Sequence, residues 1–328
     1  MGATWSQFFP PTPTLTEANL PSQKGRVFIV TGGYSGIGLE LARILYNAGG
    51  KVYIAGRSVS SGQDALRTIK SSNDTASAGE LEFLHIDLSD LQAVNAAAEE
   101  FRAKESKLDV LFNNAAVSMP PPGNTTKQGH ELQLGTNALG PYLFTQLLMP
   151  CLEKAVETAP KGSVRVVWTG SLVIDQTAPK GGFEMSKIDK PATNLPGQSD
   201  NYTLSKMANW FICSELARQS GAEGKGIMHI VQNPGNLYTN LLRHHSWLQW
   251  FVSPLLHKPI MGSYTELWAG LSEELTVEMN GCYVVPWGRV HPSPRRDLLE
   301  ALKSKEDGGT GRAAEFVEWC FEQTKEFR

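Results

Sequence analysis

Tyr202 and Lys206 are the residues whose types and spacing most directly suggest chemistry. They stand four positions apart in Tyr202-Thr203-Leu204-Ser205-Lys206, so a helix would place both side chains on one face. A free tyrosine has a pKa of about 10, and a neighbouring ammonium favours the phenolate. Lowering that pKa by about three units corresponds to about 4 kcal/mol and would give an acid and base that works near neutral pH. The pair therefore predicts proton transfer, although the pattern alone is common.

A glycine-rich turn is the second candidate site. The run 27–30 leads directly into Thr31-Gly32-Gly33-Tyr34-Ser35-Gly36-Ile37-Gly38, and a helical pattern begins at Leu39. Glycines at such a turn permit positive φ and let backbone N–H groups approach a pyrophosphate at the positive end of the helix. The order strand, turn, helix predicts a dinucleotide cofactor. The residues expected to bind it are Gly32, Tyr34, Ser35, Gly36, Ile37 and Gly38.

The end of the second expected strand indicates which dinucleotide is bound. An acidic residue about twenty positions after the turn would accept the hydrogen bonds of the adenosine ribose and mark NAD. This chain instead has Gly56 followed by Arg57, whose planar guanidinium suits a 2′-phosphate. The sequence therefore favours NADP(H) over NAD(H), and the other interpretation of Arg57 is a solvated loop residue.

These side chains must be positioned by an alternation of short apolar runs and longer amphipathic segments. Near-continuous apolar runs are typical of parallel strands buried on both faces. The expected strands are 27–30, 52–55, 81–86, 110–112, 164–168, 227–231 and 283–285, and the expected helices are 38–47, 63–70, 91–104, 128–148 and 201–218. The pattern predicts an α/β fold with one doubly wound, seven-stranded parallel sheet and helices on both faces.

Segments outside this alternation complete the predicted organisation. Residues 1–22 form an extension whose Pro-rich part, 8–13, is incompatible with regular helix. The main domain spans 23–292 and includes a long connection over 172–200 and an aromatic-rich segment over about 240–272. That segment is either a helical pair packed on the core or a lid over the substrate. A C-terminal extension over 293–328 carries an amphipathic terminal helix at 313–327.

Composition excludes several classes of protein. Thirty basic and 33 acidic residues give a net charge of −3, which offers no electrostatic reason to expect a nucleic acid or an anionic membrane as partner. No stretch reaches the roughly 18 apolar residues of a membrane span, and no secretory signal is visible. The four cysteines are scattered, which predicts buried thiols, a cytoplasmic location and no metal site.

Taken together, these motifs resemble the short-chain dehydrogenase/reductase family, from about residue 24 onward. Asp87, which follows the third strand, resembles the family's adenine-contacting aspartate, with Leu88 beside it. Asn113-Asn114-Ala115-Ala116 resembles the family's Asn-Asn-Ala-Gly element, with alanine in place of its last glycine. The resemblance implies a Rossmann-type fold and places Asp87, Leu88, Asn114 and Ala115 at the cofactor.

The resemblance also implies two further catalytic residues. Asn137 lies in Thr136-Asn137-Ala138-Leu139-Gly140, which resembles the helix of the family's active-site asparagine, whose role is to hold a water for the lysine. Ser171 follows a strand, where the family places the serine that hydrogen-bonds the substrate oxygen. It stands 31 residues before Tyr202, longer than the usual family spacing, so residues 172–200 must loop out. Ser186 is the alternative, but no strand precedes it.

The resemblance extends to the nicotinamide end and to a subgroup. Asn233-Pro234-Gly235-Asn236-Leu237-Tyr238-Thr239 resembles the family's Pro-Gly-x-x-x-Thr element, so Pro234, Gly235 and Thr239 are expected at the nicotinamide together with Tyr202 and Lys206. The chain is also similar to retinol dehydrogenases and WW-domain oxidoreductases, and more closely to fungal members with a Pro-rich leader and an element such as Pro286-Trp287-Gly288-Arg289.

The function that the resemblance implies is NADP(H)-dependent interconversion of an alcohol and a ketone or aldehyde. The substrate would be a lipophilic small molecule, such as a secondary metabolite. Two alternatives stay open, namely a non-redox cyclase or isomerase on the same fold and an NADP(H)-sensing scaffold. The family further implies a homodimer or tetramer formed through the helices 128–148 and 201–218, with a monomer also open.

Overall fold

The structure, a computed structural model, describes residues 2–71, 78–188, 197–237 and 256–328. Its centre is a sheet in the order β3-β2-β1-β4-β5-β6-β7-β8. The strands are β1 (Val27–Thr31), β2 (Lys51–Gly56), β3 (Glu80–His85), β4 (Val110–Asn113), β5 (Arg165–Thr169), β6 (Met228–Gln232), β7 (Tyr283–Val285) and β8 (Arg289–Val290). Strands β1 to β7 pair in parallel, which confirms the predicted doubly wound sheet.

The eighth strand is the one departure from the predicted sheet. Within the described residues β8 has two residues and pairs antiparallel with β7, with Val284 opposite Val290. The turn between the strands contains Gly288 with a φ of +87°, which lets the chain reverse within three residues. A strand this short carries no apolar periodicity, and for that reason the sequence predicts seven strands and not eight.

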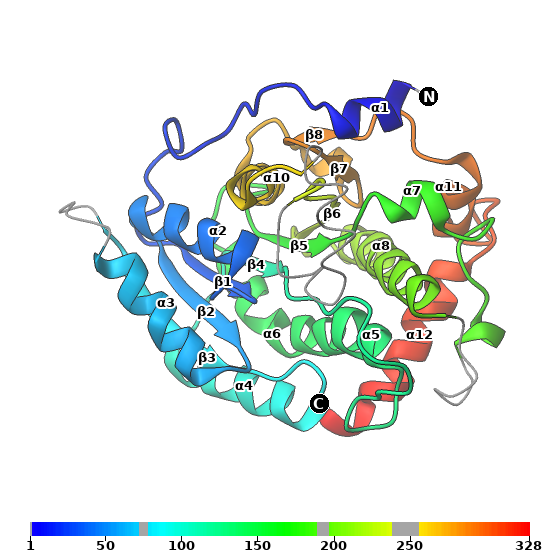
Figure 1. The fold of residues 1–328 in the computed structure, drawn as a ribbon, viewed down its shortest axis with the longest axis horizontal. Coiled ribbons are helices and arrows are strands. Elements are labelled where there is room, and N and C mark those ends of the chain that lie inside the picture. Colours follow the sequence, from blue (N-terminus) through cyan, green and yellow to red (C-terminus); the bar gives the residue numbers. More distant parts are fainter. Residues whose placement is uncertain (1, 72–77, 189–196, 238–255) are drawn as a thin grey trace.

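Helices cover both faces of the sheet (Figure 1). Helices α2 (Gly36–Asn47), α3 (Val59–Ser71) and α10 (Pro259–Leu271) pack on one face. Helices α4 (Leu91–Lys104), α6 (Gly140–Val156) and α8 (Gln198–Ala222) pack on the other, with α11 (Arg296–Leu302) and α12 (Arg312–Thr324) outside α8. Shorter elements are α1 (Gly2–Phe8), α5 (Leu132–Leu134), the π-helical turn η1 (Gly135–Leu139), α7 (Val173–Thr177), and the 3₁₀ turns η2 (Met185–Lys187), η6 (Val277–Met279) and η7 (Lys325–Phe327).

Alternation along each strand builds two cores. In β1, Val27 and Ile29 face the layer of α4, α6 and α8, whereas Phe28 and Val30 face the layer of α2 and α10. Every residue of β1 is buried, as the continuous apolar run predicts. Because the two layers clamp the sheet, the carboxyl ends of its strands are fixed relative to one another.

Two predicted segments differ in part from expectation. In the aromatic-rich segment, α10 is a core helix that packs on α2, and Trp268 is 3% exposed. Trp247, Trp250 and Phe251 lie outside the described residues. At the N-terminus, α1 was not expected, and its last residue, Phe8, lies in the part 8–13 that was predicted to be non-helical; that prediction is wrong at Phe8 and is confirmed for 9–13. Three of the four expected buried thiols are buried, but Cys282 is partly exposed.

Candidate functional site

The glycine turn joins the end of β1 to the first turn of α2. Gly36 has a φ of +55°, a conformation that side chains with a Cβ rarely adopt. A Cβ on Gly38 would lie 2.6 Å from Asn114 Nδ2, so α2 approaches the end of β4 this closely because residue 38 lacks a side chain. The first backbone N–H groups of α2, at the positive end of the helix, therefore face the edge of the sheet.

A cavity of about 310 Å³ opens beside this turn. Strands β1 and β4 are adjacent in the sheet but not in sequence, and ligands of doubly wound sheets bind at the crevice that such a crossover creates. Its lining includes ten of the residues predicted to bind the cofactor: Gly32, Tyr34, Ser35, Gly36, Ile37, Arg57, Asp87, Leu88, Asn114 and Ala115. The structure thus brings together residues from the ends of four strands.

Thr31 holds the two sides of this crevice together. Its hydroxyl accepts hydrogen bonds from the backbone N–H groups of Asn114 and Ala115, each at 3.0 Å. The Asn114 side chain in turn donates to the Thr31 carbonyl at 2.7 Å. These bonds fix the end of β4, and with it Asn114 and Ala115, against the glycine turn.

The end of β2 has no carboxylate where an NAD site would require one. A Cβ on Gly56 would overlap the ring of Tyr34, so this position is filled by the tyrosine and admits no acidic side chain without rearrangement. Arg57 follows with an exposed side chain on the rim of the cavity. Asp87, at the end of β3, accepts from the Ser89 N–H at 2.9 Å and from the Ser89 hydroxyl at 2.6 Å.

Ser171 and Tyr202 meet despite the long connection between them. The Ser171 hydroxyl lies close enough to the Tyr202 phenol to lower its pKa. The Ser171 carbonyl accepts from the Tyr283 hydroxyl at 2.8 Å, which ties the serine to β7. Ser186, the alternative, lies exposed in η2. The described part of the connection holds α7 and η2, so the serine that follows β5 contacts the tyrosine.

The electrostatics of Tyr202 and Lys206 differ from the simple expectation. Burial raises the pKa of Tyr202 to about 12, and the nearby Ser171 hydroxyl only partly opposes this. The Lys206 ammonium lies 5.7 Å from the centre of the tyrosine ring and donates to the Thr169 carbonyl at 3.0 Å. Burial lowers the pKa of Lys206 to about 8. In this structure desolvation therefore outweighs the expected lowering of the tyrosine pKa, and at neutral pH the phenol keeps its proton.

Asn137 lies in the π-helical turn η1, 2% exposed. Its amide donates to the Val117 carbonyl at 2.9 Å and to the Ser205 hydroxyl at 3.0 Å, and its carbonyl oxygen accepts from the Val117 N–H at 2.8 Å. Ser205 immediately precedes Lys206 on α8. Asn137 therefore links the loop after β4 to the helix that carries Tyr202 and Lys206.

The loop after β6 forms the remaining side of the site. The Gly170 N–H donates to the Gln232 carbonyl at 2.7 Å, so the ends of β5 and β6 are joined directly beside Ser171. Gly235 has a φ of +90°, and its N–H donates to Asn233 Oδ1 at 3.0 Å. Pro234 stands between these two residues. Thr239 lies outside the described residues.

Sequence reasoning missed three residues that contact this site. The Thr169 carbonyl accepts a hydrogen bond from the Lys206 ammonium, and Glu266 of α10 accepts one from the Thr169 hydroxyl. Gln7 of α1 accepts a hydrogen bond from the Asn233 side chain. Each contact joins residues at least 37 positions apart, and no local spacing signals it. The one available hint in the sequence was a charged residue, Glu266, inside an otherwise apolar helical pattern.

Among the described residues, no three metal-binding side chains cluster. In the same part of the chain, no helix has the length and apolar character needed to cross a membrane.

Comparisons with known proteins agree with this geometry. A family model described as short chain dehydrogenase matches residues 26–181. The short-chain dehydrogenase/reductase iacJ of Pestalotiopsis fici is 43% identical over 324 residues, which cover 96% of this chain and 95% of that protein. A short-chain dehydrogenase/reductase of Phomopsis amygdali is 41% identical over 327 residues, with 98% and 96% covered.

Solved structures share the fold. An uncharacterized protein from Mycobacterium paratuberculosis matches with a TM-score of 0.69 and 27% identity, over 96% of this chain and 98% of that one. The complex of Pseudomonas aeruginosa RhlG with NADP matches with a TM-score of 0.62 and 22% identity, over 80% and 95%. At that identity the second likeness concerns the fold alone.

Proposed function

Because the chain belongs to the short-chain dehydrogenase/reductase family and is an NAD(P)-dependent oxidoreductase, we propose that it reduces a lipophilic ketone or aldehyde with NADPH. The observation that carries this proposal is the contact of Ser171 with Tyr202 beside the buried Lys206. A protonated phenol and a serine hydroxyl are the two groups that a carbonyl oxygen needs when it becomes an alkoxide.

The residues around the cavity fit a dinucleotide. The pyrophosphate would lie against the first turn of α2, where the glycines leave the backbone open. Asp87 and Leu88 would contact the adenine. Asn114 and Ala115 would form the wall of the site between the adenine half and the nicotinamide half of the dinucleotide. Pro234, Gly235 and Thr239, with Tyr202 and Lys206, would hold the nicotinamide and its ribose. When bound, the nicotinamide supplies the hydride for the carbonyl carbon.

The chain's own residues supply the proton and hold the oxygen. Tyr202 donates its phenolic proton to the substrate oxygen, and its raised pKa means that this proton is present at neutral pH. Ser171 donates a hydrogen bond to the same oxygen as negative charge develops there. The Lys206 ammonium favours the phenolate that results, and Asn137 fixes α8 through Ser205.

The preference for NADPH rests on Arg57 and Gly56. The Arg57 side chain is exposed at the rim of the cavity and can present its guanidinium to a 2′-phosphate. Tyr34 occupies the place where a ribose-binding carboxylate would otherwise stand. The proposal of a lipophilic substrate rests on the resemblance to retinol dehydrogenases. Ile37, Leu237 and Trp287, between the glycine turn and the loop after β6, are a buried apolar cluster of the fold.

A role in secondary metabolism is supported by the fungal sources of the relatives, and the four free thiols support a cytoplasmic location.

The test is a titration of purified protein with NADPH and with NADH. The oxidation of the cofactor that binds more tightly is then measured with lipophilic ketones and aldehydes as substrates. We expect NADPH to bind at least tenfold more tightly, and we expect Arg57→Ala to remove most of that difference. Arg67→Ala is the matched control, because Arg67 is an exposed arginine on α3 away from the cavity lining. Equal binding of both cofactors would contradict the role of Arg57. Product formation without NADPH consumption would favour a cyclase or isomerase.

A further inference from the structure

Glu266 is a buried carboxyl group for which the mechanism above has no role. It lies on α10 and is 0% exposed. Its Oε1 accepts from the Thr169 hydroxyl at 3.3 Å and from Gln232 Nε2 at 3.2 Å. Its Oε2 is buried and has no hydrogen-bond partner among the described residues. A buried acid with one oxygen unpaired is costly to the fold, so its presence calls for a reason.

Thr169 connects this acid to the active-site lysine. Its hydroxyl contacts Glu266, and its carbonyl accepts from Lys206 Nζ and from Asn209 Nδ2, each at 3.0 Å. Gln232 Nε2 also donates to the Thr169 hydroxyl, at 3.1 Å. Thr169 ends β5 and stands two residues before Ser171. Thr169, at the end of β5, thus contacts Lys206 through its carbonyl and Glu266 through its hydroxyl.

The acid and the lysine also stabilise each other's charge. Lys206 is 2% exposed, and burial lowers its pKa to about 8, whereas the charge of Glu266 raises it. Burial raises the pKa of Glu266 to about 8, and Lys206 opposes this. The ionisable groups that face Lys206 are Tyr202 on its own helix and Glu266 on α10. Glu266 is therefore the acidic side chain in the described surroundings of the lysine whose negative charge, as it forms near pH 8, can compensate the charge of Lys206.

We propose that Glu266 is a positioning residue of this active site, which fixes the Lys206 ammonium through Thr169 and helps the lysine to keep its proton in alkaline solution. The proposal rests on the proposed function, because it assigns Glu266 to the same reaction. An acid that merely fills space would affect stability but not the pH at which the lysine stops working. The pH dependence of turnover therefore separates the two roles.

The first experiment is the pH profile of kcat/KM for NADPH-dependent reduction by Glu266→Gln. Glutamine keeps the shape and the acceptor oxygen but removes the charge, so Lys206 should lose its proton at lower pH. We expect the alkaline fall of kcat/KM to move down by about one pH unit, which is about a tenfold loss on that limb. Near pH 6.5, where Lys206 keeps its proton in both proteins, the loss of activity should be smaller than on the alkaline limb. If the alkaline limb does not move, the positioning role is wrong.

Glu215→Gln is the matched control. Glu215 is a buried carboxyl on α8 that pairs with Arg218 and accepts from Gln219, and within the described residues it forms no hydrogen bond or ion pair with Tyr202, Ser171 or Lys206. The variant Glu215→Gln should be less stable than wild type but should keep the wild-type pH profile of kcat/KM. If Glu266→Gln does not fold, Thr169→Val cuts the hydroxyl link while the backbone carbonyl still accepts from Lys206. It should shift the alkaline limb in the same direction, and an unshifted limb would overturn the proposal.

A second experiment needs no turnover. The urea midpoints of Glu266→Gln, Lys206→Met and the double variant form a double-mutant cycle. We expect the double variant to unfold at a higher urea concentration than the sum of the two single-variant decreases in midpoint would predict. The reason is that the double variant leaves neither charged group buried without its partner. Additive losses would overturn the proposal. A third outcome is that the cycle shows coupling but the wild-type protein reduces no carbonyl compound. That result would overturn the proposed function and with it the positioning role, and Glu266 and Lys206 would then be a structural ion pair.

Discussion

At the scale of single residues, burial controls which groups carry a proton. His229 on β6 is 1% exposed, and its Nδ1 accepts from Trp168 Nε1 at 3.4 Å. Burial lowers the pKa of His229 to about 3. In the unfolded chain the same imidazole has a pKa of about 6.5. Below that pH the unfolded state binds a proton that the folded state does not, so stability falls as the pH falls.

We predict that His229 alone costs the wild type about 2 kcal/mol between about pH 6.5 and pH 5, at about 1.4 kcal/mol per pH unit. His229→Gln should lack this loss, so its free energy of unfolding should depend less steeply on pH. Urea unfolding at several pH values measures the slope. His85→Gln, at an exposed histidine, should keep the wild-type slope. Equal slopes for wild type and His229→Gln would contradict a neutral buried imidazole.

Other residue-level features could be predicted because their motifs are local. The glycine turn, Asn114, Tyr202 and Lys206 are recognisable from neighbouring residues, and the structure places the first two together at the cavity. The contact of Ser171 with Tyr202 follows from the strand before the serine, in spite of the long spacing. The raised pKa of Tyr202 could not be predicted, because it depends on burial by distant segments.

At the scale of elements, helix α1 fastens the N-terminus onto the active-site end of the sheet. Figure 1 shows it above β7 and β8. The Gln7 side chain is 2% exposed, donates to Asp175 Oδ2 on α7 at 3.0 Å and accepts from Asn233 Nδ2 at 2.8 Å. Asp175 also pairs with His291 Nε2 at 3.0 Å. One glutamine therefore connects the segment after Ser171 to the loop that carries Pro234 and Gly235.

We expect Gln7→Leu to lower the free energy of unfolding by about 2 kcal/mol, because it leaves buried polar groups on Asp175 and Asn233 without this partner. Chemical denaturation measures the loss. Gln92→Leu, at an exposed glutamine on α4, should change stability by less than about 0.5 kcal/mol. If the two variants lose the same amount, the contact of α1 does not stabilise the fold.

Contacts such as these explain which elements the sequence did not reveal. The strands β1 to β7 and the helices α2, α3, α4 and α8 could be predicted because apolar periodicity is a local property of the sequence. The expected helix 128–148 was predicted less well, since residues 128–131 are not helical and the rest divides into α5, η1 and α6, which continues to Val156. Helix α1 depends on Gln7, whose partners lie 168 and 226 residues away. The interpretation of residues 259–271 stayed open between core and lid because apolar spacing is the same for both. Packing of Leu267 and Trp268 on the core decides it for α10.

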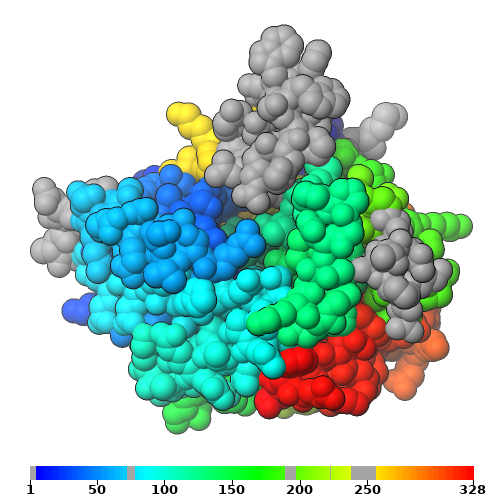
Figure 2. All heavy atoms as spheres, turned by 60° about the horizontal axis from the view of Figure 1, so that its bottom comes forward, coloured from blue at the N-terminus to red at the C-terminus, as the bar shows by residue number. Residues whose placement is uncertain are grey.

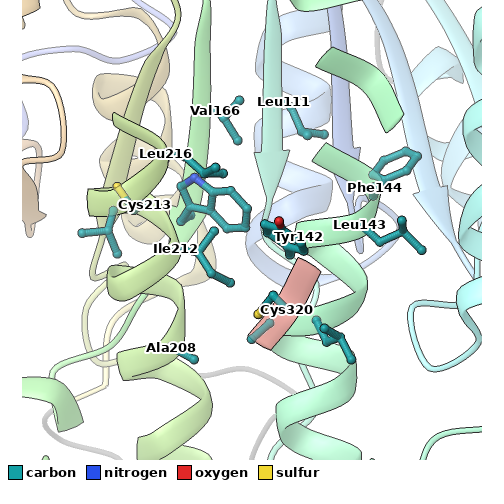
Figure 3. Packing of buried hydrophobic residues seen from close by; sticks show 14 of the residues in the cluster. Leu111, Tyr142, Leu143, Phe144, Val166, Ala208, Ile212, Cys213, Leu216 and Cys320 are labelled. Atoms are coloured by element: carbon teal, nitrogen blue, oxygen red, sulfur yellow. The ribbon is translucent and has the colours of Figure 1, made fainter. Parts of the chain in front are cut away.

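At the scale of the whole molecule, the C-terminal helix covers part of the surface that the family resemblance assigns to oligomers. Helix α12 packs on α8 and α6, and Figure 3 shows Cys320 of α12 beside Tyr142 of α6 and Ile212 of α8. Phe316 of α12 is 0% exposed and contacts Phe183 and Phe211. In Figure 2 the C-terminal residues, in red, form the outer surface at this place. Part of the helix surface expected to bind a partner is thus covered by α12.

We therefore expect a monomer with a mass of 35.9 kDa in light scattering after size-exclusion chromatography. Phe316→Asp should displace α12, expose the apolar faces of α6 and α8 and produce larger species. Phe321→Asp is the control, because Phe321 lies on the exposed side of the same helix and is 40% exposed. A wild-type dimer, or identical behaviour of the two variants, would show that α12 does not block association.

The most direct test of the central claim is a comparison of wild type with Tyr202→Phe in NADPH binding and in NADPH-dependent reduction of a carbonyl substrate. The account predicts that the variant binds NADPH within a few fold of wild type and loses at least about a hundredfold in turnover, because only the phenolic proton has been removed. A variant that binds NADPH normally and keeps its turnover would contradict the assignment of Tyr202 as the proton donor.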